Sequence, residues 1–224
     1  MAVAPFALKR ALRKVTQQRI NVLPVEEIER QSQRVLDHLR ESGVLDGARA
    51  VGCYLSMQKD ELSTDGIVKY LLARGTALYV PIIPSLPASS SSSTPYAPPP
   101  PSYDMRMLRL YSTQDWESLK RDKWGIPDAG TERKDVDSNS SREDCMSEDH
   151  SQPPLDVILV PGVAFDSQFQ RLGHGKGYYD RRSIACGTGP SLSILEHVRT
   201  TSDGAGTTTS KGIATSASTR DRGR

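Results

Sequence analysis

The sequence predicts a three-layer α/β fold in which helices flank a mostly parallel sheet. Two segments rich in apolar residues, 48–55 and 76–82, are typical of strands, and a helical pattern that ends at Gly75 lies between them. A strand–helix–strand unit with short connections implies a parallel pair joined by a right-handed crossover. A third apolar segment, 155–160, delivers a glycine-rich loop, as ligand-binding loops do in such sheets.

Two helices are expected before the first strand. The pattern predicts one over residues 5–20, where Lys9 and Arg13 lie one turn apart on one face. Without further information, a solvated basic face is the ordinary explanation of such a pair. The same helix has an apolar stripe suited to docking against the domain, formed by Leu8, Leu12 and Val15.

The second helix is expected from Pro24 to about Ser42. Proline suits the first helical position, and Gly43 suits the left-handed residue that ends a helix. Further along, an alternating segment at 104–111 predicts an edge strand.

The loop after residue 160 carries the strongest functional signal. Gly173, Gly175 and Gly177 occupy alternate positions, flanked by Arg171 and Lys176. Glycines let backbone N–H groups approach phosphate oxygens, cations offset the charge, and a helix that starts after the loop points its positive end at the anion. The pattern predicts a nucleotide-using enzyme. A flexible hinge is the alternative, because the loop is neither a dinucleotide fingerprint nor a Walker A loop.

The string that runs from Arg171 to Asp180, RLGHGKGYYD, resembles the signature of 5-formyltetrahydrofolate cyclo-ligases, also called methenyltetrahydrofolate synthetases. Three other blocks resemble this family: LKRALRK near the amino terminus, YLSMQKDELST at 54–64, and KWGIP at 123–127. Together the blocks span about residues 5–182, which we expect to form one cyclo-ligase-like domain.

The resemblance implies a reaction and a set of site residues. Family members close 5-formyltetrahydrofolate to 5,10-methenyltetrahydrofolate, consume ATP as co-substrate with Mg²⁺ as cofactor, and release ADP and phosphate. The implied catalytic residues are Lys176 and Arg171, and the implied metal ligand is Asp180, a hard oxygen donor. The implied ATP-binding residues are Lys9, Arg13, Arg171, Leu172, Gly173, His174, Gly175, Lys176, Gly177, Tyr178 and Tyr179. The implied substrate-binding residues are Leu55, Glu61, Trp124, His174, Gly175, Lys176, Gly177 and Tyr178.

Simpler structural roles remain open for four of these residues. Glu61 could cap a helix near Thr64, and Trp124 or Tyr179 could belong to the core. His174 could be a solvent-facing loop residue.

The composition of three segments predicts that they are disordered. Residues 84–103 are rich in serine and proline, residues 129–154 are polar and acid-rich, and residues 183–224 are dominated by Ser, Thr and Gly without an apolar run that suggests a buried strand. The last segment departs from the family, whose members carry further strands and a late metal-binding aspartate there. An alternative function is therefore a catalytically impaired folate or nucleotide binder, or a truncated gene product that lacks the carboxyl-terminal metal ligand.

Composition limits the partners. A net charge of +2 indicates neither nucleic acid nor an anionic membrane as a bulk partner, so small molecules, the reduced folate and ATP, are expected. Three cysteines without metal-like spacing fit a reducing compartment, with Cys53 buried in a strand. We expect a cytoplasmic monomer. A mitochondrial location is the alternative, because five basic residues precede the first acid, Glu26.

Overall fold

The computed structural model describes residues 5–83, 105–136, 140–145, 155–166, 168 and 170–179, together with two strands at 192–199 and 210–217. Its helices are α1 (Pro5–Ile20), α2 (Val25–Glu41), α3 (Asp65–Ala73) and α4 (Thr113–Glu117). Its strands are β1 (Ala50–Cys53), β2 (Ala77–Ile82), β3 (Arg106–Leu110), β4 (Lys120–Arg121), β5 (Pro127–Asp128), β6 (Val157–Gly162), β7 (Ala164–Phe165), β8 (Arg171–Leu172), β9 (Leu192–Arg199) and β10 (Ser210–Ala217).

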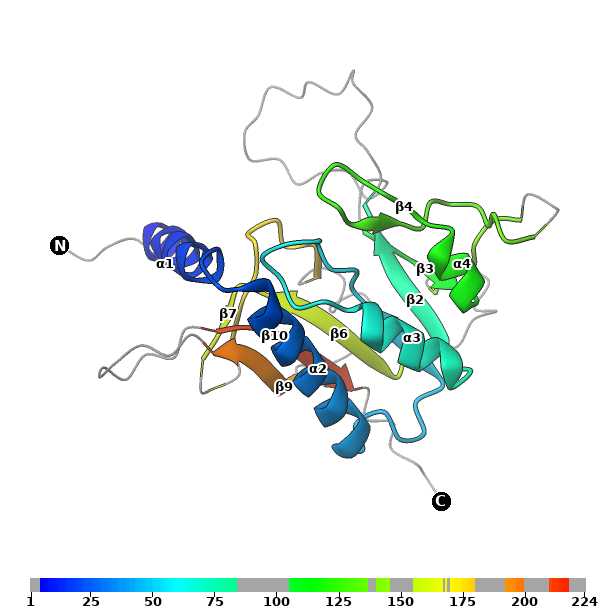
Figure 1. The fold of residues 1–224 in the computed structure, drawn as a ribbon, viewed down its shortest axis with the longest axis horizontal. Helices are drawn as coiled ribbons and strands as arrows, with labels where there is room; N and C mark the ends of the chain where they lie inside the picture. The colour runs from blue at the N-terminus through cyan, green and yellow to red at the C-terminus, as the bar shows by residue number, and fades with distance from the viewer. Residues whose placement is uncertain are drawn as a thin grey trace.

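Six strands form the central sheet in the order β3-β2-β1-β6-β10-β9 (Figure 1). Strand β1 pairs in parallel with both β2 and β6, whereas β3, β10 and β9 add antiparallel neighbours on the two sides. The predicted α/β class, with parallel strands at the centre, is confirmed. Strands β1 and β6 are buried along their whole length, as expected for a parallel pair at the centre of a sheet.

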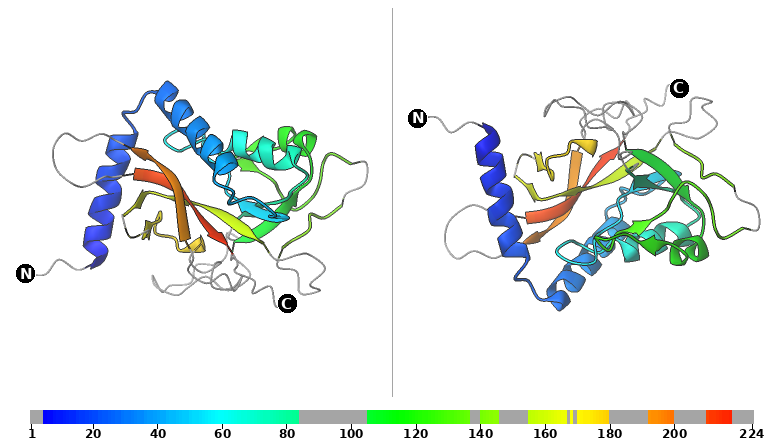
Figure 2. Two further views of the ribbon diagram at one scale, coloured as in Figure 1. Left: turned by 90° about the horizontal axis from the view of Figure 1, so that it is seen from below. Right: turned by 90° about the horizontal axis from the view of Figure 1, so that it is seen from above.

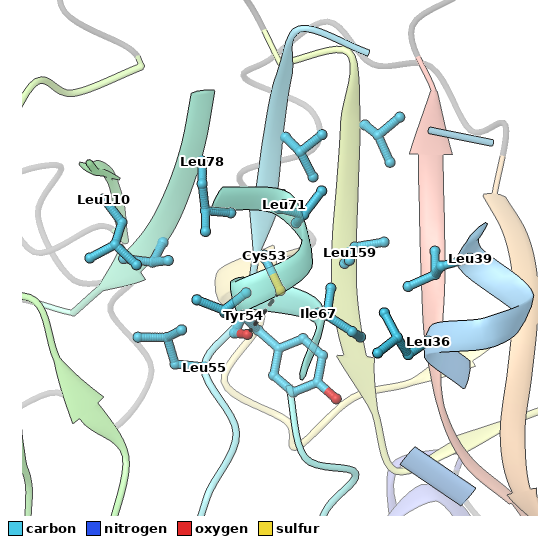
Figure 3. Packing of buried hydrophobic residues seen from close by; sticks show 14 of the residues in the cluster. Leu36, Leu39, Cys53, Tyr54, Leu55, Ile67, Leu71, Leu78, Leu110 and Leu159 are labelled. Carbon is cyan, nitrogen blue, oxygen red and sulfur yellow. Dashed lines mark hydrogen bonds between the residues drawn. The ribbon is translucent and has the colours of Figure 1, made fainter. Parts of the chain in front are cut away.

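Alternate residues of the central strands supply two separate cores, one on each face of the sheet. The core on the helix side includes Val51, Cys53 and Leu159, which pack with leucines of α2 and α3 (Figure 3). The core on the opposite side includes Ala50 and Ile158, packed with side chains from β3 and from the loop after β6. Helices α2 and α3 cover one face of the sheet (Figure 2). The next helix that the family resemblance implies, after the glycine loop, falls largely outside the described residues.

The predicted helices and strands occur close to their expected bounds. Helix α1 coincides with the predicted range 5–20, and α2 starts one residue after Pro24, which lies at its N-cap position. Gly43 follows α2 with φ +70°, the left-handed stop that the sequence predicts. No helix in the described ranges is both long and apolar enough to cross a membrane.

The apolar stripe of α1 does not dock as predicted. Leu8, Leu12 and Val15 are 62, 39 and 43% exposed. Instead the adjacent face of the helix packs inward, with Thr16 and Ile20 buried. The helix is turned so that its Arg13 side, rather than its leucine side, contacts the domain.

The second predicted disordered insertion is partly ordered, which corrects the prediction for 129–136 and 140–145. Residues 140–145 lie along the outer side of β3, where Arg109 N donates to Glu143 O and Cys145 N to Met107 O. Ion pairs hold the two together, Arg106–Asp144 at 2.9 Å and Arg109–Glu143 at 2.6 Å. Polar composition predicts disorder only when no partner is available, and here the open edge of β3 provides one. The serine- and proline-rich spacer, 84–103, lies outside the described residues.

The carboxyl-terminal segment also needs a correction. Two parts of the predicted disordered tail form β9 and β10, and β10 pairs antiparallel with β6 from Ala217 opposite Val157 to Gly212 opposite Gly162. The sequence of β9, LSILEHVR, has aliphatic residues that favour a strand, but they are diluted when the composition is averaged over residues 183–224. The rest of that segment is outside the described residues.

Candidate active site

The two predicted site segments lie at the same edge of the sheet. Strands β1 and β6 are parallel neighbours, so the loops that leave their carboxyl ends, 54–64 and 163–179, start side by side. From β1 the chain proceeds to β2 on one side, whereas β6 lies on the other side. This is a topological switch point, the place where open α/β sheets bind their ligands.

The glycine loop has a conformation that requires glycine. Gly175 and Gly177 adopt φ +96° and +69°, a region that other residues rarely enter. The small β7–β8 hairpin delivers the loop, with Val163 N donating to Leu172 O at 2.7 Å. At the tip, His174, Gly175 and Lys176 are exposed. The loop therefore presents backbone and one lysine to the solvent, as a phosphate site needs.

Helix α1 supports this loop from outside. Arg13 Nε donates a hydrogen bond of 2.7 Å to Gly173 O, across 160 residues of sequence. A Cβ atom placed on Gly175 would lie 3.4 Å from Arg13 Cζ, so the guanidinium also lies beside the second glycine. Lys9 is exposed one turn earlier on α1. The contact accounts for the inward turn of the Arg13 side of the helix, and it brings the amino-terminal block next to the glycine loop.

Arg171 holds the base of the loop. Its Nη1 donates to Pro161 O at 2.9 Å, at the end of β6, and a Cβ on Gly173 would lie only 2.8 Å from the same nitrogen. Its guanidinium lies 5.9 Å from the centre of the Tyr179 ring. Arg171 thus supports the loop with part of its hydrogen-bonding capacity, while Lys176 is the more exposed cation.

The other segment, 54–64, is closed on itself. Ser56 and Thr64 exchange hydrogen bonds, Ser56 N to Thr64 Oγ1 at 3.1 Å and Thr64 N to Ser56 Oγ at 3.0 Å. Glu61 is only 8% exposed, and its Oε2 accepts from Met57 N at 3.0 Å. This hydrogen bond lies within the loop rather than at the start of α3. Leu55, predicted to contact substrate, is buried in the helix-side core.

A group of ionisable side chains lies beneath this edge, of which Tyr179 is partly buried and Cys53, Tyr54 and Glu61 are buried. Burial raises the pKa of the Tyr54 hydroxyl well above its usual value, and the negative charge of Glu61 raises it further. Burial and then Glu61 also raise the pKa of Tyr179, whereas Arg171 opposes the rise. Burial alone raises the pKa of the Cys53 thiol to about 12. The charge of Glu61 in the 54–64 segment therefore influences the ionisation of Tyr179 in the glycine loop.

Sequence reasoning misses Tyr54 in this group. Its place directly after β1, at the carboxyl end of a central parallel strand, is the signal that could have identified it. The tyrosines of the loop differ from each other. Tyr178 packs against the core opposite the helices, whereas Tyr179 packs against both cores, as its alternative structural role predicts.

Trp124 lies on a separate hairpin that approaches the 54–64 segment. Strands β4 and β5 bracket a turn in which Asp122 Oδ1 accepts from both Trp124 N and Ile126 N. The indole is 63% exposed, with Lys123 Nζ 5.2 Å from the ring centre, so Trp124 is not a core residue. Gly125 has φ +77°, and a Cβ placed on it would lie 2.9 Å from Gln58 Cβ. The structure thus brings the hairpin that carries Trp124 next to the predicted folate segment, through Gly125 and Gln58.

The metal site is not formed by the residues that the structure describes. Within them, no three His, Cys, Asp or Glu side chains gather into a group that could hold a metal ion. Asp180, the predicted Mg²⁺ ligand, lies outside those residues.

Comparisons with known proteins support the same interpretation. The model of the 5-formyltetrahydrofolate cyclo-ligase family matches residues 6–197, which extends the similarity 15 residues beyond the span that the motifs predict. The chain is 30% identical over 185 residues to 5-formyltetrahydrofolate cyclo-ligase of Mus musculus, covering 83% of this chain and 78% of that protein. It is 30% identical over 176 residues to the Saccharomyces cerevisiae protein of the same name, covering 78% of this chain and 75% of that protein. The NMR structure of Aquifex aeolicus 5,10-methenyltetrahydrofolate synthetase superimposes with a TM-score of 0.52 at 26% identity, covering 78% of this chain and 71% of that one.

Proposed function

The chain belongs to the 5-formyltetrahydrofolate cyclo-ligase family, and we propose that its ATP-dependent ligase reaction takes place at the edge formed by the ends of β1 and β6. The observation that carries this proposal is the meeting of two segments at that edge. One is the glycine loop with its two supporting arginines, and the other is the predicted folate-binding segment around Glu61. A ligase that couples two substrates needs two adjoining subsites.

The chemistry explains why phosphate and folate must adjoin. Amide-like resonance makes the formyl group a poor electrophile, and its oxygen is a poor leaving group. Transfer of the γ-phosphoryl group of ATP to that oxygen corrects both faults. The neighbouring folate nitrogen attacks the activated carbon, the carbon–oxygen bond breaks, and phosphate leaves. No protein nucleophile is required, so the protein's work is positioning and charge neutralisation.

On the phosphate side, we assign the clamp to four cations and three glycines. Lys176 reaches the transferred phosphoryl group from the exposed tip, whereas Arg171 neutralises charge at the base. Arg13 and Lys9 approach from α1, and Arg13 already contacts the loop. The remaining ATP contacts come from the glycine loop, from Leu172 to Tyr179.

On the folate side, Glu61 holds the pterin or formyl end by hydrogen bonds, and Trp124 stacks on the substrate. The exposure of Trp124, and the approach of its neighbour Gly125 to Gln58, support that role. Tyr178, together with His174 at the loop tip, lines the boundary between the two subsites. Leu55 acts from the core, because its side chain is buried.

Magnesium is assigned to Asp180 and the phosphates, and it would supply charge neutralisation on ATP. The described residues do not complete a metal site, so no step is derived through the ion. We further propose that the protein works as a monomer, in the cytoplasm or, as the basic amino-terminal segment suggests, in the mitochondrion.

The deciding experiment is turnover of 5-formyltetrahydrofolate with ATP and Mg²⁺, followed by the near-ultraviolet absorbance of the methenyl product. ATP-dependent growth of that band is the expected result. Folded protein that binds ATP or folate without forming the band would instead favour the impaired binder, and transcript reads across codons 180–190 would identify a truncated gene product.

A further inference from the structure

Arg142 and Asp115 form a completely buried ion pair. Both side chains are 0% exposed, and the contact is bidentate, with Nη1–Oδ2 and Nη2–Oδ1 both 2.6 Å. Burying two charges costs several kcal/mol per ion by general estimates and is offset only when further hydrogen bonds satisfy both groups. Such a pair, in a segment whose composition predicts disorder, calls for an explanation beyond stability.

The additional hydrogen bonds join three segments of the chain. Arg142 Nε donates to Ala129 O at 2.8 Å, and Nη1 also donates to Arg109 O at 3.0 Å. Asp115 Oδ2 in turn accepts from Tyr111 N at 3.0 Å. One guanidinium therefore ties together β3, α4 and the residue that directly follows β5.

The third of these segments is the base of the Trp124 hairpin. Strands β4 and β5 are two residues each, and all residues from 120 to 124 are exposed. Only Pro127 and Ala129, at the end of the hairpin, are buried. A second link, Arg121 to Asp65 at 3.6 Å, is about 40% exposed on both sides and is weak. The hairpin is therefore anchored at its inner end, by Ile126, which packs against the helix-side core, and by what holds residues 127–129.

We propose that Arg142 is a positioning residue for folate binding, which sets the place of Trp124 by fixing Ala129. This inference rests on the proposed function, because it takes Trp124 as a contact of the folate. Arginine suits the task because its planar donors can satisfy a carboxylate and two carbonyl groups together, which lysine cannot do. The ATP side is independent of this link, since the glycine loop is supported by Arg13 and Arg171 from other elements.

The first test is Arg142→Lys, which keeps the charge opposite Asp115 but loses the bonds to the two carbonyls. We expect KM for 5-formyltetrahydrofolate to rise about tenfold, as for a misplaced binding group, with KM for ATP unchanged. Hydrogen exchange of the peptide 120–128 should quicken, while that of β6 stays slow. Arg106→Lys is the matched control, because it alters the ion pair with Asp144, which also joins segment 140–145 to β3, without touching the hairpin.

If Arg142→Lys does not fold by circular dichroism, the double variant Arg142→Met with Asp115→Asn replaces it. That pair removes both charges and keeps an acceptor for Tyr111 N. The same rise in folate KM is expected from it.

Separate outcomes distinguish this inference from the proposed function. One possible result is that Trp124→Ala raises KM for 5-formyltetrahydrofolate, whereas neither Arg142 variant raises it and hydrogen exchange of the peptide 120–128 is unchanged. That result overturns the positioning role alone. If the wild-type protein forms no methenyl product, the proposed function fails. The positioning role is then measured in Trp116→Phe protein by the quenching of Trp124 fluorescence on addition of 5-formyltetrahydrofolate. Weaker quenching with Arg142→Lys supports the role, and equal quenching or none overturns it.

Discussion

The two loops that meet at the active edge are held in opposite ways. The 54–64 segment is closed from within, by the Ser56–Thr64 exchange and by Glu61 accepting from Met57 N. The glycine loop is supported mainly by side chains that lie outside its tip, Arg13 on α1 and Arg171 at its base, and its tip is exposed. If the proposed roles hold, the folate side is preformed, whereas the phosphate side is completed by ATP.

The largest expected effect is at the exposed tip. Lys176→Ala should lower kcat/KM for ATP about 100-fold, because it removes a charge that meets the transferred phosphoryl group. Its unfolding free energy should change by less than about 0.5 kcal/mol, since the side chain is exposed. Steady-state kinetics and urea unfolding measure the two effects. Lys14→Ala, an exposed lysine of α1, is the control, and wild-type kinetics in the Lys176 variant would remove that residue from the clamp.

The contact between the hairpin and the folate segment is tested at two glycines with similar backbones. Gly125→Ala places a Cβ 2.9 Å from Gln58 Cβ, so it should push Trp124 away and raise folate KM about tenfold. Gly130 also has positive φ, +59°, but nothing lies within 4 Å of its added Cβ. Gly130→Ala therefore controls for backbone strain. Equal folate KM values in the two variants would contradict a role for the hairpin.

Internal closure of the 54–64 segment predicts a loss of stability. Thr64→Val keeps the shape of a fully buried side chain but leaves Ser56 N without its acceptor, which should cost about 1–2 kcal/mol of unfolding free energy. Urea unfolding measures it against the exposed Thr113→Val. A neutral result would mean that the segment is not held from within.

Because the glycine loop is supported by side chains outside its tip, loss of one support should change KM for ATP alone. Arg13→Ala should raise KM for ATP about fivefold, the equivalent of one net hydrogen bond of about 1 kcal/mol, and leave folate KM unaltered. Arg10→Ala, an exposed arginine on the same helix, should alter neither constant. A rise in both KM values would show that the two loops do not depend on separate supports.

The last prediction concerns stability at high pH and the buried thiol of Cys53, at the end of β1. The Cys53 thiol has a pKa raised by burial from 9.0 to about 12 in the folded protein. Its protonated form favours folding below pH 9, and this contribution is lost as the pH rises from 9 towards 12. Unfolding free energy in that window should fall by up to about 1.4 kcal/mol per pH unit more in the wild type than in Cys53→Val. Parallel pH profiles of the two proteins would show that the thiol ionises equally when folded.

Local patterns predict most of the fold, whereas the pairing of distant motifs is predicted only through the family resemblance. The bounds of α1 and the parallel β1–β2 unit follow from periodicity, and the Gly43 stop follows from turn chemistry. The approach of Arg13 to the glycine loop is predicted only through the family resemblance, because two cations four residues apart carry no information about a partner 160 residues away. Composition alone gives a wrong result for 140–145, where tertiary pairing with β3 orders a polar segment. The buried pair of Arg142 and Asp115 is invisible to periodicity for the same reason.

The link between α1 and the glycine loop also sets an order of events during synthesis. Arg13 leaves the ribosome early, but Gly173, its partner, is made 160 residues later. At about 5–20 residues per second, the helix waits roughly 10–30 s before the bond can form. The proposed nucleotide subsite therefore cannot assemble on a nascent chain, however well α1 has folded, until Gly173 has been made.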